Sequence, residues 1–203
     1  MNINLQRFCA NSLDVREYLR APWVHGEWVY ATNGHIAIRV PVWEGGDVAA
    51  GIKGKHPDAN RLFVRAFGLE GAFLEMPADL AKPDTCESCG GTGIHNTIKC
   101  PDCNDGEFKH GSFTYECQNC AGSPVGEGYL TTGDKDAPIK TCHVYDGLGQ
   151  RRGKAVVGAV SFDIIYLNWI AELPNAHIKV STTDDVAAIK FDGGQAILMP
   201  RRD

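Results

Sequence analysis

The chain of 203 residues is 43% hydrophobic and 22% charged, an ordinary composition for a globular protein with room for one domain and an additional segment. No run of about 18 apolar residues could cross a bilayer and the first residues lack a signal peptide, so we expect a cytoplasmic protein without a membrane partner. The formal net charge of −5 argues against an overall basic, phosphate-neutralising surface.

Apolar residues in the N-terminal part of the chain alternate as in strands, with one short helical stretch. We predict, in order, a strand over 3–8, a helix over 13–19, strands over 28–31 and 36–40, and a strand over 62–67. The sequence Thr32-Asn33-Gly34-His35 between the two middle strands is typical of a turn.

The middle of the chain has a different composition. Between Cys86 and Gly149 there are only seven Val, Ile and Leu residues, too few for a hydrophobic core, but seven of the eight cysteines. The same stretch carries the whole net charge of −5. We therefore predict an insertion over 84–149, stabilised by metal, within one domain formed by 1–83 and 150–203.

The last fifty residues show the clearest secondary structure. We predict a strand over 155–160, a helix over 161–173 with Ser161 as its N-cap, and strands over 177–181, 186–191 and 195–199. The last two strands are joined by Asp192-Gly193-Gly194, which is typical of a hairpin. A strand, a helix and three strands thus follow one another on both sides of the insertion, which predicts a duplicated α+β unit.

The cysteines of the insertion follow a repeated motif, CxxCxGxG. Its copies begin at Cys86, Cys100, Cys117 and Cys142, and their second cysteine positions hold Cys89, Cys103, Cys120 and Tyr145. Two thiolates at this spacing reach one tetrahedral ion from a single tight turn, while the glycines let the backbone fold back toward the sulfur atoms. The spacing predicts metal sites and disfavours free thiols.

Four such copies resemble the cysteine-rich zinc domain of DnaJ-type co-chaperones. The resemblance implies two Zn²⁺ ions per chain, one shared by the second and third copies and one by the first and fourth. The residues it assigns to zinc are Cys86, Cys89, Cys100, Cys103, Cys117, Cys120 and Cys142, with His143, Asp146 or water as the eighth ligand and His143 preferred. Sequential pairing, first copy with second and third with fourth, is the alternative. Because no HExxH-type base is present, a structural zinc is favoured over a catalytic one.

The flanks resemble a second family, the bacterial DNA-polymerase sliding clamps. The resemblance rests on the stretches Tyr30–His35, Ser161–Leu167, Ile178–Val180, Ala187–Phe191 and Ala196–Arg201. It implies an α+β, sliding-clamp-like domain of two strand-helix-three-strand units, interrupted by the insertion. Since clamp rings contain six such domains and this chain has room for one, a ring would require a homo-oligomer of six subunits.

The clamp resemblance also implies partners. In clamps a terminal Met-Pro-x-Arg borders an apolar pocket that takes peptides from polymerases, and Met199, Pro200 and Arg201 occupy that place. DNA is the other implied partner, but the predicted helix over 161–173 lacks the basic residues that line a clamp's bore. We expect a non-enzymatic zinc protein of DNA metabolism that docks a replication or repair protein, and a small clamp-like chain with an insertion fits a bacteriophage origin.

Two other functions stay open. An adaptor or inhibitor could bind a basic protein, such as a host protein, through the acidic insertion, with the clamp-like part as a scaffold. A zinc hydrolase using Asp146 or His143 is the least favoured alternative.

Overall fold

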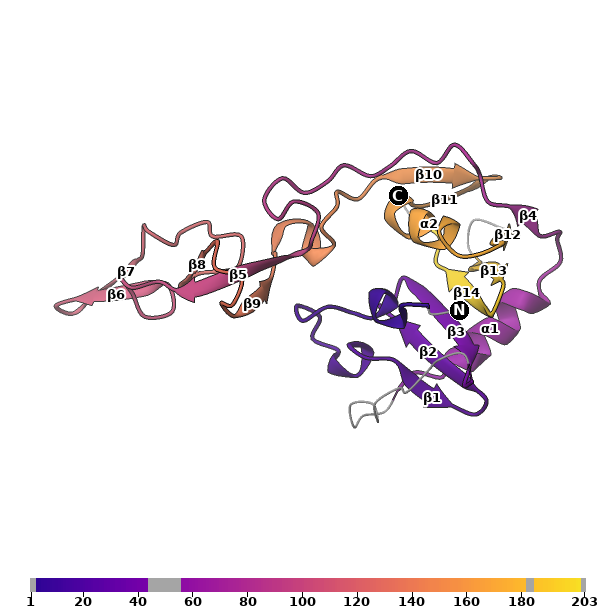
Figure 1. Ribbon diagram of the computed structural model, residues 1–203, viewed down its shortest axis with the longest axis horizontal. Coiled ribbons are helices and arrows are strands. Elements are labelled where there is room, and N and C mark those ends of the chain that lie inside the picture. Colours follow the sequence, from indigo (N-terminus) through magenta and orange to yellow (C-terminus); the bar gives the residue numbers. More distant parts are fainter. Residues whose placement is uncertain (1–2, 44–55, 182–184, 202–203) are drawn as a thin grey trace. The chain divides into compact units, whose positions relative to one another are not determined.

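The computed structural model describes residues 3–43, 56–181 and 185–201. The chain forms two compact units: Met1–Pro83 with Arg152–Asp203, called the body below, and Asp84–Arg151, called the insertion. Figure 1 shows the elements of each unit. Among the described residues, no helix has the length and apolar character needed to cross a membrane.

A seven-stranded sheet forms the centre of the body, and all its neighbouring strands are antiparallel. Its order is β1-β2-β3-β14-β13-β12-β4, so the C-terminal hairpin pairs with the N-terminal strands (Figure 1). The strands are β1 (Trp23–His25), β2 (Trp28–Thr32), β3 (Ile36–Pro41), β4 (Leu74–Glu75), β12 (His177–Lys179), β13 (Ala187–Phe191) and β14 (Gly194–Leu198). The Asp192-Gly193 turn joins β13 to β14, with Phe191 opposite Gly194, which confirms the predicted hairpin.

Helix α1 (Ala59–Gly68) covers one face of this sheet. The side chain of Asp58 caps the helix by accepting a hydrogen bond from the N–H of Arg61 (3.4 Å). Ala59, Phe63 and Ala66 lie one helical turn apart and form the buried side of the helix. Their core partners on the sheet and its margin are Trp23, Tyr30, Ala37, Val186, Ala188 and Ile197.

The opposite face of the sheet is covered by two apolar segments. Alternation along β3 places Ile36 and Ile38, both fully buried, on the side opposite to Ala37. The 3₁₀ turn η1 (Leu5–Phe8) contacts β2 and β3 there, and the ring of Phe8 meets Trp169 of helix α2 edge-on at 5.9 Å. Six of the eight residues of α2 (Ile164–Ala171) are buried, so this helix is enclosed on most sides.

Three N-terminal predictions are wrong. Residues 3–8 form the turn η1 rather than a strand, and of the helix predicted over 13–19 only a second 3₁₀ turn, η2 (Glu17–Leu19), is present. Residues 62–67, predicted as a strand from their aromatic and β-branched side chains, belong to α1. The cap at Asp58 and the helical spacing of the buried residues override β propensity there. The N-terminal half is therefore not a strand-helix-three-strand unit.

The C-terminal half has the predicted order with two local changes. The strand predicted over 155–160 is a hairpin, β10 (Lys154–Val157) and β11 (Val160–Asp163), turned at Gly158 with a left-handed φ of 63°. Helix α2 begins after Asp163, whose carboxylate accepts from the N–H of Ile165 (3.0 Å), instead of after Ser161. From β11 to β14 the order is strand, helix and three strands, and the body as a whole is α+β.

The insertion has almost no hydrophobic core. Its strands are β5 (Ile94–Lys99), β6 (Glu107–His110), β7 (Phe113–Glu116), β8 (Tyr129–Thr131) and β9 (Ile139–Thr141), followed by the 3₁₀ turn η3 (Val144–Gly147). Strand β5 pairs with β8 and β9, and β6 forms a separate hairpin with β7. Its buried apolar residues are six cysteines and Val125, so thiol groups take the place of a core in this unit.

Candidate functional site

The turn between β2 and β3 is held by two polar side chains. The hydroxyl of Thr32 donates to the carbonyl oxygen of Ile36 (2.6 Å) and accepts from the N–H of Gly34 (3.0 Å). The carboxamide oxygen of Asn33 accepts from the N–H groups of His35 (2.9 Å) and Ile36 (3.2 Å). The predicted turn is confirmed, and both side chains are engaged in holding its shape.

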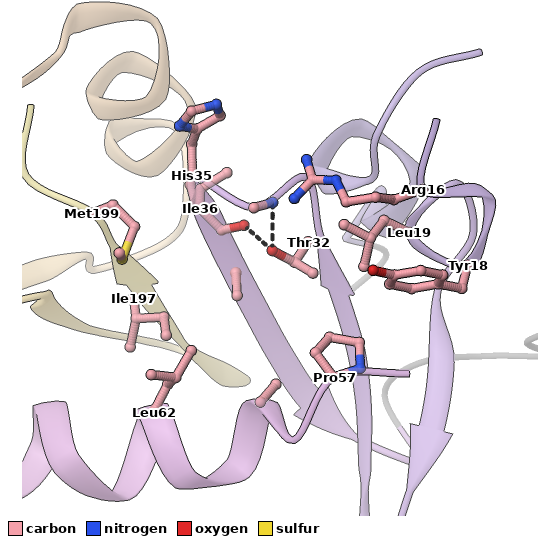
Figure 2. Close-up of a pocket in the computed structure, with 13 residues that line it drawn as sticks. Arg16, Tyr18, Leu19, Thr32, His35, Ile36, Pro57, Leu62, Ile197 and Met199 are labelled. Atoms are coloured by element: carbon pink, nitrogen blue, oxygen red, sulfur yellow. Dashed lines mark hydrogen bonds between the residues drawn. The ribbon is translucent and has the colours of Figure 1, made fainter. Parts of the chain in front are cut away.

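An apolar pocket of about 180 Å³ opens beside this turn (Figure 2). Four parts of the body line it: Arg16, Tyr18 and Leu19; Thr32, Gly34, His35, Ile36 and Ala37; Pro57, Ala59 and Leu62; and Ile197 and Met199. Leu62 and Met199 are each 43% exposed, so apolar surface at the pocket is accessible from solvent. The pocket can therefore take an apolar side chain from outside the body.

Among the described residues that line this pocket, Arg16 brings the one charged group, and its guanidinium is already paired. It forms a two-pronged contact with the carboxylate of Asp14, with Nε to Oδ1 at 2.9 Å and Nη2 to Oδ2 at 2.7 Å. That hydrogen bonding lowers the pKa of Asp14 below its usual value. A side chain at position 34 would meet the Arg16 guanidinium at 2.7 Å, so Gly34 is required for Arg16 to lie over the turn.

The C-terminal stretch predicted to bind partners lies at the same place. The N–H of Met199 donates to the carbonyl oxygen of His35 (2.9 Å), which fixes Met199 beside the turn. A second, open cavity of about 410 Å³ is lined by Gly34, His35, Arg152, Asp163, Tyr166, Met199, Pro200 and Arg201. The structure thus brings together Tyr30–His35 and Met199–Arg201, the two stretches that the sequence singled out from opposite ends of the chain.

His35 stands where the two cavities meet. Its ring stacks on Tyr166 with centroids 5.8 Å apart. Desolvation and then the positive charges of Arg152 and Arg16 hold its pKa below the usual histidine value. The imidazole is therefore neutral at pH 7, and the described charged groups of the larger cavity are Arg152, Arg201 and Asp163, whose carboxylate lies 3.9 Å from the Arg152 guanidinium.

Among the described α-helices of the body, α1 alone carries basic residues, Arg61 and Arg65. Besides the pairing of Arg16, the guanidinium of Arg20 donates to the carbonyl oxygen of Asp14 (2.7 Å) and lies 3.5 Å from the carboxylate of Glu17. Helix α2 is mostly buried and has no basic residue. On the exposed side of α1, Arg65 pairs with Asp185 (2.7 Å). Arg16, Arg20 and Arg65 thus contact the body itself, whereas Arg61 is exposed on α1.

The cysteines of the insertion gather into two clusters, and in each the Sγ atoms lie within 4.8 Å of one another. One cluster holds Cys100, Cys103, Cys117 and Cys120, and the other Cys86, Cys89 and Cys142. This grouping is the interleaved one that the DnaJ-type resemblance implies, and it differs from sequential pairing. Both clusters could hold a metal ion, and four thiol groups at such distances suit a tetrahedral ion such as Zn²⁺.

The four-cysteine cluster is built from two backbone loops that hydrogen-bond to each other. The N–H of Cys100 donates to the carbonyl oxygen of Gly128 (2.8 Å), and that of Cys117 to Gly106 (2.7 Å). The N–H of Gly128 donates to the Sγ of Cys120 (3.2 Å). Backbone N–H groups of Cys120 and Asn119 lower the pKa of the Cys117 thiol to about 7, whereas desolvation raises the pKa of Cys103 to about 12 and that of Cys120 as well, so the loops favour the thiolate form at Cys117 but not at Cys103 or Cys120.

The three-cysteine cluster repeats this arrangement. The N–H of Cys86 donates to the carbonyl oxygen of Gly149 (2.9 Å), and that of Cys142 donates to Gly93 (2.8 Å). A methyl group on Gly149 would overlap the carbonyl oxygen of Gly91, so the two loops approach as closely as glycine allows.

Cys89 shows how this fold favours thiolate. Burial by itself raises its pKa, but the N–H groups of Gly93 (3.3 Å from Sγ) and Gly91, together with the Cys86 thiol, hold the pKa below the usual thiol value. The donor set and the N–H groups directed at sulfur therefore fit a metal ion in this cluster as well.

The structure does not bring His143 into this cluster. Within residues 56–181, described without a gap, no histidine, aspartate or glutamate donor joins the three cysteines. His143 is exposed, and its ring lies against Gly126. A Cβ atom added at Gly126 would be only 3.0 Å from the Cε1 atom of His143. The residue in the second cysteine position, Tyr145, and the following Asp146 both have left-handed φ values, 52° and 56°. Such a conformation costs about 1–2 kcal/mol for each non-glycine residue.

Sequence reasoning missed one surface of the insertion. In the β6–β7 hairpin, Phe108 is opposite Tyr115 and His110 is opposite Phe113, so four rings share one face. Phe108 and Tyr115 stack with centroids 5.5 Å apart, yet Phe108, Phe113 and Tyr115 are 42%, 66% and 47% exposed. The sequence signal for this surface is the alternation of rings with polar residues over 107–116.

Comparisons with known proteins give similarity in fold only. No family model matches the chain, and no curated protein matches it. Among solved structures, it is similar to the DNA polymerase III subunit beta from Pseudomonas aeruginosa, at 13% identity and a TM-score of 0.44, covering 98% of this chain and 64% of that one. It is also similar to Caulobacter crescentus pol III beta, at 14% identity and a TM-score of 0.41, covering 99% of this chain and 63% of that one. The chain therefore spans less than two thirds of the length of these polymerase subunits.

Proposed function

We propose that this protein is a non-enzymatic, clamp-like protein of DNA metabolism that docks a partner through the pocket beside the β2–β3 turn. The observation that carries the proposal is the meeting of Tyr30–His35 with Met199–Arg201 at one apolar pocket. The partner is a replication or repair protein that presents a short peptide. The proposal requires no catalytic group in the pocket. The polar side chains of Thr32 and Asn33 form hydrogen bonds within the turn.

The two adjoining cavities indicate what such a peptide contains. The smaller one, between Leu62 and Met199, is lined almost wholly by apolar groups and suits a leucine-sized or aromatic side chain. The larger one contains Arg152 and Arg201 beside the carboxylate of Asp163, so its arginines outnumber its one described acid and favour a further carboxylate nearby. We therefore expect a peptide with an apolar anchor and an acidic residue close to it.

Leu62→Arg tests this proposal. Peptides selected from a random library on the immobilised protein supply the ligand, and their affinity is then measured calorimetrically. Placing a charged group in the apolar pocket should weaken binding at least about tenfold, since burying a leucine-sized side chain contributes roughly 1.5–3 kcal/mol. Val64→Arg is the matched control, because Val64 is 64% exposed on the same helix and does not line the pocket. Equal affinities in the two variants would refute docking at this pocket.

We also propose that the two cysteine clusters bind Zn²⁺, two ions per chain, and that zinc stabilises the insertion instead of catalysing a reaction. The support is the donor set, four thiol groups in one cluster and three in the other, with backbone N–H groups directed at sulfur. Native mass spectrometry would report the number of zinc ions and of subunits in one measurement. A zinc-free chain would refute this part of the proposal.

A second function has one specific observation in its favour. The exposed rings of Phe108, Phe113 and Tyr115 form an apolar face on an acidic unit, which suits a basic protein partner with apolar residues better than nucleic acid. In this case the insertion would be the binding surface of an adaptor or inhibitor.

Paired substitution of the stacked rings tests the adaptor function. Phe108→Ala with Tyr115→Ala should abolish binding to a partner that requires the insertion, while the content of bound zinc stays unchanged. Thr114→Ala, on the opposite face of the same hairpin, is the control and should bind normally. If the ring-deleted variant binds its partner like the wild type, the adaptor function is wrong.

A further inference from the structure

The three-cysteine cluster has the backbone of a four-cysteine site with one position changed. In the first motif copy, Gly90, Gly91 and Gly93 have φ values of 58°, 87° and 72°. The corresponding residues of the fourth copy are Asp146, Gly147 and Gly149, with φ values of 56°, 73° and 70°. The two loops therefore share one conformation over these positions.

The departure is at Tyr145, which corresponds to Cys89. Tyr145 has a left-handed φ of 52°, whereas Cys89 is not among the residues with positive φ. The loop retains the glycines and the reciprocal hydrogen bonds of Cys86 and Cys142 that hold a metal-binding turn. It lacks only the fourth sulfur.

An open cavity of about 630 Å³ lies next to this position. Residues from the first and the fourth motif copies line it, together with the chain segments next to them. They are Cys86, Glu87 and Ser88; Val144 and Tyr145; and Asp84, Thr85 and Arg151. Tyr145 is 40% exposed. A small molecule or a side chain from another protein can therefore approach the cluster from solvent.

We propose that the Cys86–Cys89–Cys142 site is completed by a thiolate from outside the chain that enters through this cavity. The inference rests on the proposed binding of zinc. Zinc in closed sites takes four ligands, and the neighbouring cluster shows that this insertion builds all-sulfur sites. Arg151 lines the cavity together with the carboxylates of Asp84 and Glu87, so the choice of sulfur rests on the all-sulfur neighbouring cluster and on the loop position that holds Cys89 in the first copy. The thiolate comes either from a small free thiol or from a cysteine side chain of a partner protein.

The test uses the full-length protein loaded with Co²⁺, whose sulfur-to-metal charge-transfer absorption reports the number of sulfur ligands. Titration with 2-mercaptoethanol or with N-acetylcysteine amide should raise this absorption to saturation. X-ray absorption of the zinc form should change from about 3.5 sulfur ligands per ion to about 4, the averages for one three-sulfur and one four-sulfur site. Tighter binding of N-acetylcysteine amide would indicate a protein cysteine, and equal binding a free thiol.

Tyr145→Cys is the matched variant, because it places a thiol in the vacant position of the shared loop. It should show about 4 sulfur ligands per ion without added thiol and no further response to it. Should that variant fail to fold, His143→Ala and Asp146→Ala in the wild-type background still test whether the fourth ligand comes from outside the chain. Both variants should keep the cobalt spectrum and the thiol response.

Three outcomes would overturn the inference. The first is a wild-type cobalt spectrum that neither thiol changes. The second and third are a cobalt spectrum altered by His143→Ala and one altered by Asp146→Ala, because either change would mean that the fourth ligand lies within the chain. Metal counting keeps these results separate from the proposed function. A protein that binds no metal refutes zinc binding itself, whereas two metal ions without a thiol response refute only the external ligand.

Discussion

Removal of metal is expected to unfold the insertion and to leave the body folded. In an excess of chelator, the backbone amides of Asp84–Arg151 should lose protection against hydrogen exchange, while those of β3, β13 and β14 keep theirs. The reason is that cysteines and Val125 are the only buried apolar residues of the insertion, whereas the body has an extensive core on both faces of its sheet. Structural zinc sites contribute about 10–16 kcal/mol to folding in zinc-finger peptides at pH 7, more than this insertion can supply otherwise.

Segment-resolved hydrogen exchange by mass spectrometry measures this effect directly. Cys117→Ser should lose the ion of the four-cysteine cluster and the protection of the loops around it. Cys9→Ser is the control: Cys9 lies in the body outside both clusters, its Sγ donates to the carbonyl oxygen of Leu5 (3.7 Å), and burial raises its pKa to about 12. That variant should bind metal like the wild type. An insertion that stays protected in chelator would contradict a metal-stabilised unit.

The pairs of cysteines that form each cluster could be predicted from the sequence because the information for them is local. A CxxC pair fixes two ligands within one turn, and the glycines that follow determine how the turn closes, as the matching φ values around Gly91 and Gly147 show. Which two turns contribute to the same cluster depends on contacts between residues that are distant in the sequence. Spacing left interleaved and sequential pairing open. The interleaved grouping follows from the Sγ distances of the folded chain and from the mutual hydrogen bonds of Cys100 with Gly128 and of Cys117 with Gly106.

The errors in the body arose where tertiary contacts decide local structure. The run Leu62-Phe63-Val64 has β propensity, but Phe63 is buried and its two neighbours are exposed, which a helix on a sheet allows. Likewise, the predicted strand over 3–8 is replaced over 5–8 by a 3₁₀ turn, because Leu5 and Phe8, three positions apart, are both buried where the turn packs on β2 and β3. Turns with side-chain hydrogen bonds, such as Thr32–His35, were predictable because their stabilising groups lie within the turn itself.

The pocket could be predicted only in part. Met199, Pro200 and Arg201 were identified through the clamp resemblance, but Leu62 and Tyr18 came from segments whose secondary structure was predicted incorrectly. A pocket wall is assembled from distant parts of the chain. When the secondary structure of one part is predicted incorrectly, the residues that this part contributes to the pocket cannot be predicted. The correct assignment of α1 adds Leu62, the residue that gives the proposed docking site its most direct test.

Phe63→Ala is expected to have the largest effect on the stability of the body. The Phe63 side chain is completely buried, and its ring meets Tyr30 edge-on at 5.9 Å. The Arg39 guanidinium lies 4.4 Å from the Phe63 ring centroid and equally far from that of Trp28 on another side. Truncation removes the ring and leaves a cavity beside a buried cation, so we expect a loss of about 3–5 kcal/mol in the free energy of unfolding.

Urea denaturation followed by tryptophan fluorescence measures this loss. Val64→Ala on the same helix should change the free energy by no more than about 0.5 kcal/mol, because Val64 is mostly exposed. Phe63→Leu should fall between the two, since it keeps apolar volume but loses the contact between ring and guanidinium. Because natural domains have only about 5–15 kcal/mol of stability, Phe63→Ala should also weaken peptide binding by detaching the helix that carries Leu62. If Phe63→Ala were no more destabilising than Val64→Ala, α1 could not be the helix that anchors this face of the sheet, and the pocket wall would lose its physical basis.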